Sequence, residues 1–147
     1  MNAITIQTIV NSPVDVVWER WNKPEHIERW AFASDDWEAL NAENDLRVGG
    51  TLKTTMAARD KSASFDFTGV YTALKEHELI EYNMDDPPSH EATEGQRGRH
   101  VKIEFSSVPE GVKIVETFDA ETENSEEMQR SGWQAILDNF KKHAESI

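Results

Sequence analysis

A single acidic residue interrupts an apolar strand face near the end of the chain. Four residues alternate there and share one face of the predicted strand: Val112, Ile114, Glu116 and Phe118. Burial on such a face would raise the pKa of the Glu116 carboxyl unless a partner such as Tyr71 or Arg99 bonds to it. The carboxyl could then orient a ligand hydroxyl or act as an acid or base. A shift of one residue in register would instead place Glu116 in solvent.

The other residue types that carry chemistry are dispersed. The five histidines form no H-E-x-x-H motif and no pair at helical ligand spacing, and the chain has no cysteine. No G-x-S-x-G motif occurs, and Gly49-Gly50 lacks the lysine and the following helix that a phosphate loop needs. We therefore expect no metal site, no cofactor and no cysteine nucleophile, and the catalytic residues, if any, are unknown.

The composition is strongly acidic. The chain carries 28 acidic and 15 basic residues, a net charge of −13. Because phosphate backbones and anionic lipid surfaces require clustered Lys and Arg, nucleic acid is not an expected partner. Residues 119–127 hold five acids and no base. This run is either a solvated connection or a docking surface for a basic partner.

The chain length bears on the number of domains, and the hydropathy bears on where the protein is located in the cell. Residues 1–8 carry no basic segment followed by an apolar run, and no stretch of eighteen apolar residues occurs. With no cysteine, the chain suits a reducing compartment. We expect a single domain over residues 1–147, located in the cytoplasm and without membrane insertion.

A long helix is predicted from Asn124 to Glu145. Its apolar stripe consists of Trp133, Ile136, Leu137, Phe140 and Ala144. Five polar residues are predicted to face away: Arg130, Gln134, Asp138, Lys141 and Glu145. Asn124 is the predicted N-cap, with Glu127 completing a capping box. Gly132 lies on the buried side, where it either lets a strand approach closely or leaves room for something that is not protein.

The segment before this helix predicts a helical pair followed by a strand meander. Residues 3–10 alternate as a half-buried strand, and Ser12-Pro13 then predicts an N-cap with proline at the first helical position. Pro24 opens a second short helix with Ile27 and Trp30 on its apolar side. Six further strands are predicted: a weak one near 36–40, then 51–58, 64–73, 79–84, 101–108 and 112–118. Residues 85–99 form a long polar loop, either a lid or a mobile segment.

A sheet of this many antiparallel strands curls, and one helix covers only part of its concave face. The remaining space is either filled by large side chains or stays a pocket. Alternation and helical position predict the residues that would line such a pocket: Trp30, Phe65, Phe67, Tyr71, Ile103, Phe105, Ile114, Glu116, Trp133 and Ile136. The same side chains could equally be ordinary core.

Several local patterns resemble a known family. They are Ser12-Pro13 with Val16-Val17-Trp18, residues 21–25 with Trp30, Val48-Gly49-Gly50, Gly69-Val70-Tyr71 with residues 79–82, and Gly132-Trp133. In this order they resemble the Bet v 1-like, START-related helix-grip (SRPBCC) superfamily, and within it the branch homologous to the activator of Hsp90 ATPase. The resemblance covers essentially the whole chain. Asp60-Lys61 departs from the Asp-Gly that is common in relatives, which affects only a turn.

The resemblance implies an α+β fold, in which a curved antiparallel sheet of about seven strands wraps around the C-terminal helix. It also implies a hydrophobic cavity that holds an apolar or amphipathic small molecule. A fold alone does not fix an activity, so three hypotheses stay open. The chain is a small-molecule binding module, a partner-binding protein of the Hsp90-activator type, or a cyclase- or aromatase-like enzyme that uses Glu116. The sequence favours a binding protein over an enzyme.

Overall fold

The computed structural model describes residues 3–32, 35–84, 100–120 and 125–146, apart from the side chain of Phe65. Three features of the sequence interpretation lie outside these residues: the loop 85–99 with Arg99, and the proposed cap residue Asn124. Within the described residues the chain forms seven strands and three helices, in the order β, two α, six β, α. This confirms the α+β helix-grip prediction.

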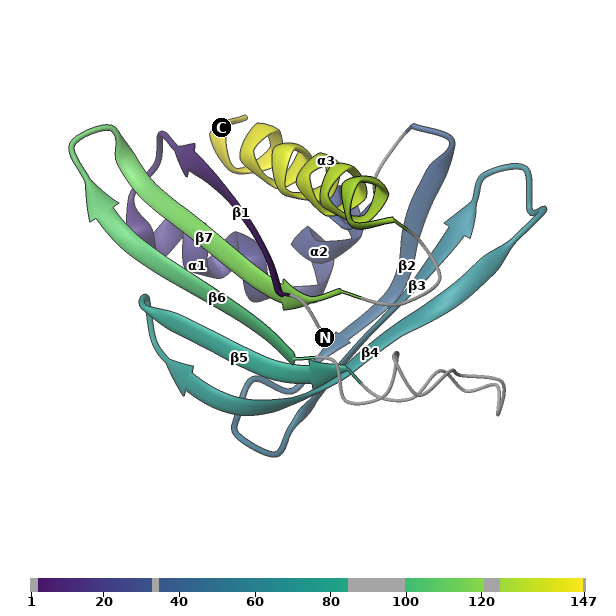
Figure 1. The fold of residues 1–147 in the computed structure, drawn as a ribbon, viewed down its shortest axis with the longest axis horizontal. Helices are drawn as coiled ribbons and strands as arrows, with labels where there is room; N and C mark the ends of the chain where they lie inside the picture. Colours follow the sequence, from purple (N-terminus) through teal and green to yellow (C-terminus); the bar gives the residue numbers. More distant parts are fainter. Residues whose placement is uncertain (1–2, 33–34, 85–99, 121–124, 147) are drawn as a thin grey trace.

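The strands form one antiparallel sheet in the order β1-β7-β6-β5-β4-β3-β2. Their bounds are β1 Ala3–Val10, β2 Trp37–Asn44, β3 Thr51–Ala58, β4 Ser64–Lys75, β5 Leu79–Met84, β6 His100–Val108 and β7 Gly111–Asp119. Figure 1 shows the sheet curled into a trough with β1 and β2 at its two edges. Most predicted strands are correct within two residues, because their alternation is regular.

Strand β2 is the exception, because it runs four residues further than its predicted end. Its pairing with β3 shifts register between Leu40 and Glu43, and Asn41 has a left-handed φ of 53°. An inserted residue of this kind is a β-bulge, which changes the face that the following side chains occupy. A prediction based on alternation therefore misses the second half of β2, because the alternation changes phase at the bulge.

Helices α1 (Val14–Asn22) and α2 (Pro24–Trp30) form the predicted pair after β1. Pro24 starts α2 as predicted, and Ile27 and Trp30 are buried. The predicted capping of α1 by Ser12 is wrong, because Pro13 holds the cap position without a side-chain bond. The Ser12 hydroxyl instead donates to the carbonyl of Ala144 at 3.1 Å, so it ties the start of α1 to the last helix.

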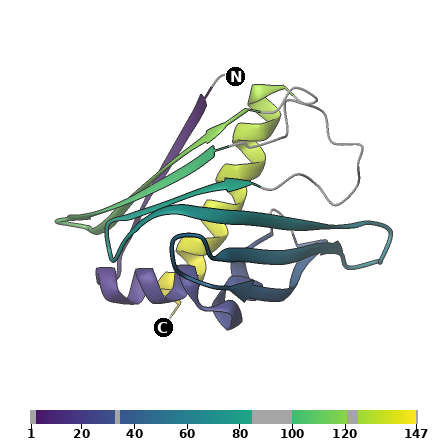
Figure 2. The same cartoon turned by 90° about the horizontal axis from the view of Figure 1, so that it is seen from below.

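Helix α3 (Glu126–Glu145) lies across the concave face of the sheet, obliquely to the strands (Figure 2). Its N-cap is Ser125, whose Oγ accepts a hydrogen bond from the N–H of Met128 at 3.1 Å. The predicted capping box is therefore wrong, since the third position belongs to Met128 and a thioether side chain cannot return the bond. The apolar stripe is as predicted, with Leu137, Phe140 and Ala144 fully buried.

The polar side of α3 faces the open edge of β1. The sequence pattern predicts instead that these polar side chains face away from the sheet. Three helical side chains donate to successive outer carbonyls of β1: Arg130 to Thr5 at 2.8 Å, Gln134 to Gln7 at 3.4 Å and Lys141 to Ile9 at 2.7 Å. Beyond the strand, the Asn11 N–H donates to Glu145 Oε2 at 2.7 Å. These contacts give partners to backbone groups that an edge strand leaves unpaired. We call them the edge contacts of α3.

The core is densest where α3 meets β1, β7 and β6. The largest side chains with almost no exposure lie mainly on these elements, among them Phe118, Phe140, Leu137, Ile4 and Ile114. Phe140 also packs against the two tryptophans of the helical pair, with ring centroids 4.7 Å from Trp21 and 5.0 Å from Trp30. Close packing of this kind locks the orientation of α3 over one half of the sheet.

Candidate functional site

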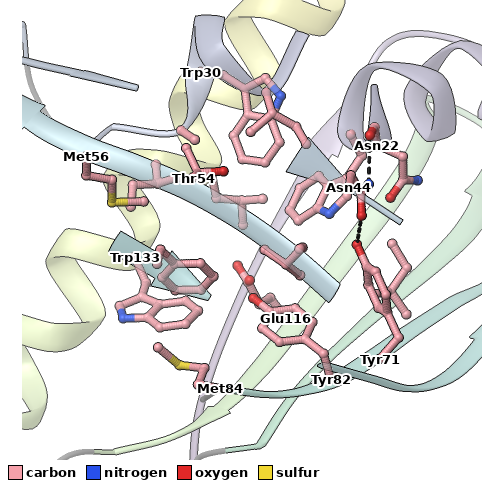
Figure 3. Close-up of a pocket in the computed structure, with 18 residues that line it drawn as sticks. Asn22, Trp30, Asn44, Thr54, Met56, Tyr71, Tyr82, Met84, Glu116 and Trp133 are labelled. Carbon is pink, nitrogen blue, oxygen red and sulfur yellow. Dashed lines mark hydrogen bonds between the residues drawn. The ribbon is translucent and has the colours of Figure 1, made fainter. Parts of the chain in front are cut away.

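A cavity of about 320 Å³ lies beneath α3, between the helical pair and the curled sheet (Figure 3). It has the size and largely apolar lining of small-molecule sites, at the lower end of their range. Six of the predicted residues line it: Trp30, Phe67, Tyr71, Glu116, Trp133 and Ile136. The helices contribute the first and the last two of these, and β4 and β7 the others.

Three predicted residues do not line the cavity. Ile103, Phe105 and Ile114 are buried on the inner face of the sheet, but in the half that the helices cover. The rings of Trp18 and Trp21 pack edge-on against Phe105, with centroids 5.3 Å and 5.8 Å away. Alternation identifies the inner face, but it does not show which half of that face the helices cover. The side chain of Phe65 lies outside the described part of the chain.

Glu116 reaches the cavity from the middle of β7, and Figure 3 shows its carboxyl pointing into that space. Its strand neighbours are Ile6 on β1 and Ile103 on β6, and the residue is 5% exposed. No described residue forms a hydrogen bond or an ion pair with this carboxyl. Burial raises its pKa to about 8, so at neutral pH it is mainly a neutral acid that can both donate and accept.

Tyr71, one of the two possible partners considered for Glu116, is engaged elsewhere. The hydroxyl of Tyr71 donates to Asn44 Oδ1, a bond that Figure 3 draws as a dashed line. Burial raises the pKa of Tyr71, which keeps the phenol in its neutral, donating form. Tyr71 is therefore not a hydrogen-bond partner of Glu116, and these two residues form no acid–base dyad.

Two asparagines form a polar corner at the end of the cavity near the helical pair. Asn44 Nδ2 donates to the backbone carbonyl of Asn22 at 2.7 Å, and Asn22 Nδ2 donates to the carbonyl of Trp18 at 2.9 Å. The remaining atom, Asn22 Oδ1, is buried and has no hydrogen-bond partner in the described structure. An unsatisfied buried acceptor costs about 1–3 kcal/mol, so it is an unusual feature of a native interior.

Aromatic rings form most of the cavity wall opposite this corner. Trp133 stacks on Phe118, with ring centroids 3.9 Å apart and planes 10° apart, and Phe67 meets Trp133 edge-on at 6.2 Å. The ring of Tyr82 lies over Gly69, where an added Cβ would be only 2.7 Å from Tyr82 Cδ2. The close approach of the Tyr82 ring therefore requires a glycine at position 69. The aromatic rings contact one another around the cavity and do not fill it.

Gly132 does not serve to let a strand approach α3 closely, which is one of the two roles predicted for it. A Cβ at this position would meet no heavy atom within 4 Å among the described residues outside the helix itself, so no described strand approaches closely there. Nor does Gly132 line the cavity. The reason for a glycine at this point of α3 is not visible in the described contacts.

Two further observations concern metals and membranes. No group of three or more His, Asp or Glu side chains with metal-binding geometry occurs in the described part of the chain. The described helices also include none that is both long and apolar enough to cross a bilayer.

Several lining residues were missed by the sequence interpretation. The polar and aromatic ones are Trp21, Asn22, Asn44, Thr54 and Tyr82, and the apolar ones are Ile27, Ala31, Leu52, Met56, Ile80, Met84 and Leu137. Tyr82 and Leu137 could have been found from the patterns of β5 and α3, which were recognised. Asn44 follows the bulge of β2, and Asn22 depends on the angle between α1 and α2, so neither has a local signal.

A curved antiparallel sheet that grips a C-terminal helix, with a helical pair after the first strand and a cavity inside, defines the helix-grip class shared by Bet v 1-like and START-related proteins. Within that class, the chain belongs to the family described as Activator of Hsp90 ATPase homolog 1-like protein, whose pattern matches residues 11–145. A comparison with curated proteins found no match.

Solved structures agree with this assignment. An AHSA1-like protein from Aeromonas hydrophila is 41% identical, with a TM-score of 0.86 over 99% of this chain and 93% of that one. A protein from Cytophaga hutchinsonii is 45% identical, with a TM-score of 0.79 over 99% and 94% of the two chains. The Aha1 dimer from Colwellia psychrerythraea is 15% identical, with a TM-score of 0.71 over 99% and 97%, which shows a common fold alone.

Proposed function

We propose that this protein binds a small apolar or amphipathic molecule in the cavity beneath α3. The observation that carries the proposal is an apolar, aromatic-lined space of about 320 Å³ that contains the buried carboxyl of Glu116, which has no protein partner in the described structure. Empty apolar space and an unsatisfied polar group each lower stability. A ligand that fills the space and bonds to this carboxyl would recover both losses.

Binding is tested by native mass spectrometry of the freshly purified protein and by thermal shift with a panel of apolar and amphipathic compounds. We expect a co-purifying small molecule or a concentration-dependent rise in melting temperature, because a ligand that binds only the folded state stabilises it. If no small molecule co-purifies and no compound changes the melting temperature, the proposal is wrong.

A matched pair of variants tests whether the ligand occupies the cavity. Thr54→Trp places a large ring in the cavity from β3, where Thr54 is buried and lines the space. Thr68→Trp makes the same change on β4, at a position that alternates with the inward-facing Phe67 and Gly69. We expect binding to be lost only in the first variant. Equal binding by both would place the ligand outside the cavity.

We also propose a second candidate, a partner-binding protein of the Hsp90-activator type. The net charge of −13 favours it, because an acidic surface attracts a basic one on a chaperone or another protein. The family to which the chain belongs, described as Activator of Hsp90 ATPase homolog 1-like protein, points in the same direction. The test is stimulation of the Hsp90 ATPase at low salt, with loss of the effect at high salt. No complex and no stimulation at low salt would rule out this candidate.

A further inference from the structure

Several of the polar side chains that line the cavity are already engaged within the protein. Three of them donate there: Asn22 to Trp18, Asn44 to Asn22 and Tyr71 to Asn44. Trp30 Nε1 also donates to the carbonyl of Arg20 at 2.9 Å. By contrast, the Glu116 carboxyl has no protein partner in the described structure. The cavity therefore offers an ionisable group that is free to pair with a ligand.

The described cavity wall also lacks positive charge. None of the residues that line the cavity in the described structure is Lys, Arg or His, so nothing in the wall could neutralise an anionic ligand. Six of the described lining residues are aromatic: Trp21, Trp30, Phe67, Tyr71, Tyr82 and Trp133. The faces of such rings attract cations, most strongly in the case of tryptophan. The protein as a whole carries a net charge of −13, which raises the local concentration of cations around it.

On the basis of the proposed binding function, we propose that the ligand is a compact organic amine that binds as its ammonium ion. Its apolar body packs against the aromatic wall, and its N–H groups donate to the carboxylate of Glu116. A carboxylate ligand would be buried without a cationic side chain of the described wall to pair with it. An alcohol can hydrogen-bond to the Glu116 carboxyl, but it lacks the charge that an ion pair and cation–π contacts require.

Binding an ammonium ion changes the protonation of Glu116. In the empty cavity its pKa is about 8 through burial, so at pH 7 the carboxyl holds a proton. A cation beside the carboxyl favours the ionised form, and the proton passes to solvent as the ion pair forms. No other ionised group lines the cavity in the described residues, since Tyr71 and Tyr82 are its remaining titratable side chains. Ile6 and Ile103 flank Glu116 on the neighbouring strands. We therefore expect one proton to be released for each amine bound, and this proton comes from the Glu116 carboxyl.

The test compares matched ligands. Cyclohexylmethyl, phenylpropyl and naphthylmethyl skeletons are each used as primary amine, primary alcohol and carboxylic acid. Isothermal titration at pH 7 in two buffers of different ionisation enthalpy gives both the affinity and the protons released. We expect the amine of a skeleton that fits to bind at least about tenfold more tightly than its alcohol, a difference of about 1.4 kcal/mol. We also expect about one proton released per amine, and weaker binding still of the acid.

Variants assign the effect to Glu116. Glu116→Gln keeps the shape of the side chain and removes its charge, so it should lower amine affinity about tenfold or more, abolish proton release and change alcohol affinity little. Glu104→Gln, at an exposed position of β6, is the matched control and should change none of these quantities. Proton release from the unaltered protein is measured without any variant, so the test holds even if Glu116→Gln folds poorly.

The outcomes separate this inference from the proposed function. Alcohols or acids that bind as tightly as the amines, or amines that bind without proton release, would overturn the amine assignment and leave a general binding site. If no member of any series binds and the broader panel also fails, the cavity holds no ligand and both proposals are wrong.

Discussion

The two halves of the sheet use the same helix in different ways. At the β1 edge, polar side chains of α3 bond to the strand, and its apolar stripe packs into a core of fully buried residues. Over β3 and β4, the helix and the sheet enclose the cavity, and Leu52, Met56 and Phe67 are only partly buried around it. The first half provides most of the packing, and the second provides the space for a ligand.

This difference shows how the fold combines stability with an empty interior. We therefore expect the half containing β2, β3 and β4 to open locally at lower free energy than the half containing β1, β7 and β6.

Replacing Phe140 tests the packed half. Phe140→Ala removes a fully buried ring that touches Trp21 and Trp30, so it should lower the free energy of unfolding by about 3–5 kcal/mol in urea denaturation. Ile136→Ala, on the cavity side of the same helix, should cost less than half as much, because Ile136 is only partly buried. Equal losses in the two variants would show that the halves do not differ in packing.

The pH dependence of stability tests the burial of Glu116, which reaches the cavity from β7. The pKa of Glu116 is about 8 in the folded protein, against 4.5 as its ordinary value, so between these values the folded state holds the extra proton. Stability from this residue is complete below the lower pKa and is lost as the pH rises toward the upper one. Urea denaturation from about pH 5 to about pH 9 should show a decline on the order of 4 kcal/mol at most.

Glu116→Gln provides the control for that titration. The amide does not ionise, so the decline between about pH 5 and about pH 9 should largely disappear in this variant. A decline of unchanged size would show that other groups cause it and that the carboxyl is solvated in the folded protein. Added amine ligand should reduce the decline in the unaltered protein, because binding requires the ionised carboxylate.

The edge contacts can be weakened singly. Lys141→Met keeps a long side chain but removes the bond from Nζ to the Ile9 carbonyl at 2.7 Å. Because the contact is partly exposed, we expect a loss of about 1 kcal/mol and faster amide hydrogen exchange in β1. Lys142→Met, at the exposed neighbouring position, is the matched control. If both variants behave alike, the edge contacts contribute nothing measurable.

The smallest effect concerns Gly132. Gly132→Ala should stabilise the protein by about 0.5–1 kcal/mol, because alanine favours the helix and its Cβ would meet open space in the described structure. Ligand affinity should not change, since Gly132 does not line the cavity. A loss of stability would reveal a close neighbour of this glycine.

The sequence predicts this fold well because its periodic signals are long and unbroken. The alternation of β7 runs through nine residues, and it places Glu116 on the inner face although glutamate is polar. The stripe on α3 likewise identifies Leu137 and Phe140 as buried. Each of these predictions depends on one element, whose period alone decides which residues face inward.

The site is less predictable because it depends on relations between elements. Ile103, Phe105 and Ile114 have the correct inward face but lie beneath the helices. The bulge at Asn41 changes the face of β2 on which the following side chains lie, and Asn44 therefore points toward the cavity. A pattern based on alternation does not predict such an insertion. Sequence periodicity therefore gives the orientation of a side chain but not the distance between two elements.

The edge contacts of α3 also affect how molecules of this protein meet one another. An uncovered edge strand can recruit a strand from a neighbouring molecule and begin fibril growth. Here the carbonyls of Thr5, Gln7 and Ile9 already accept bonds from within the same chain. A strand from a neighbouring molecule would first have to displace the side chains of Arg130, Gln134 and Lys141 from these carbonyls, which disfavours strand addition along this border.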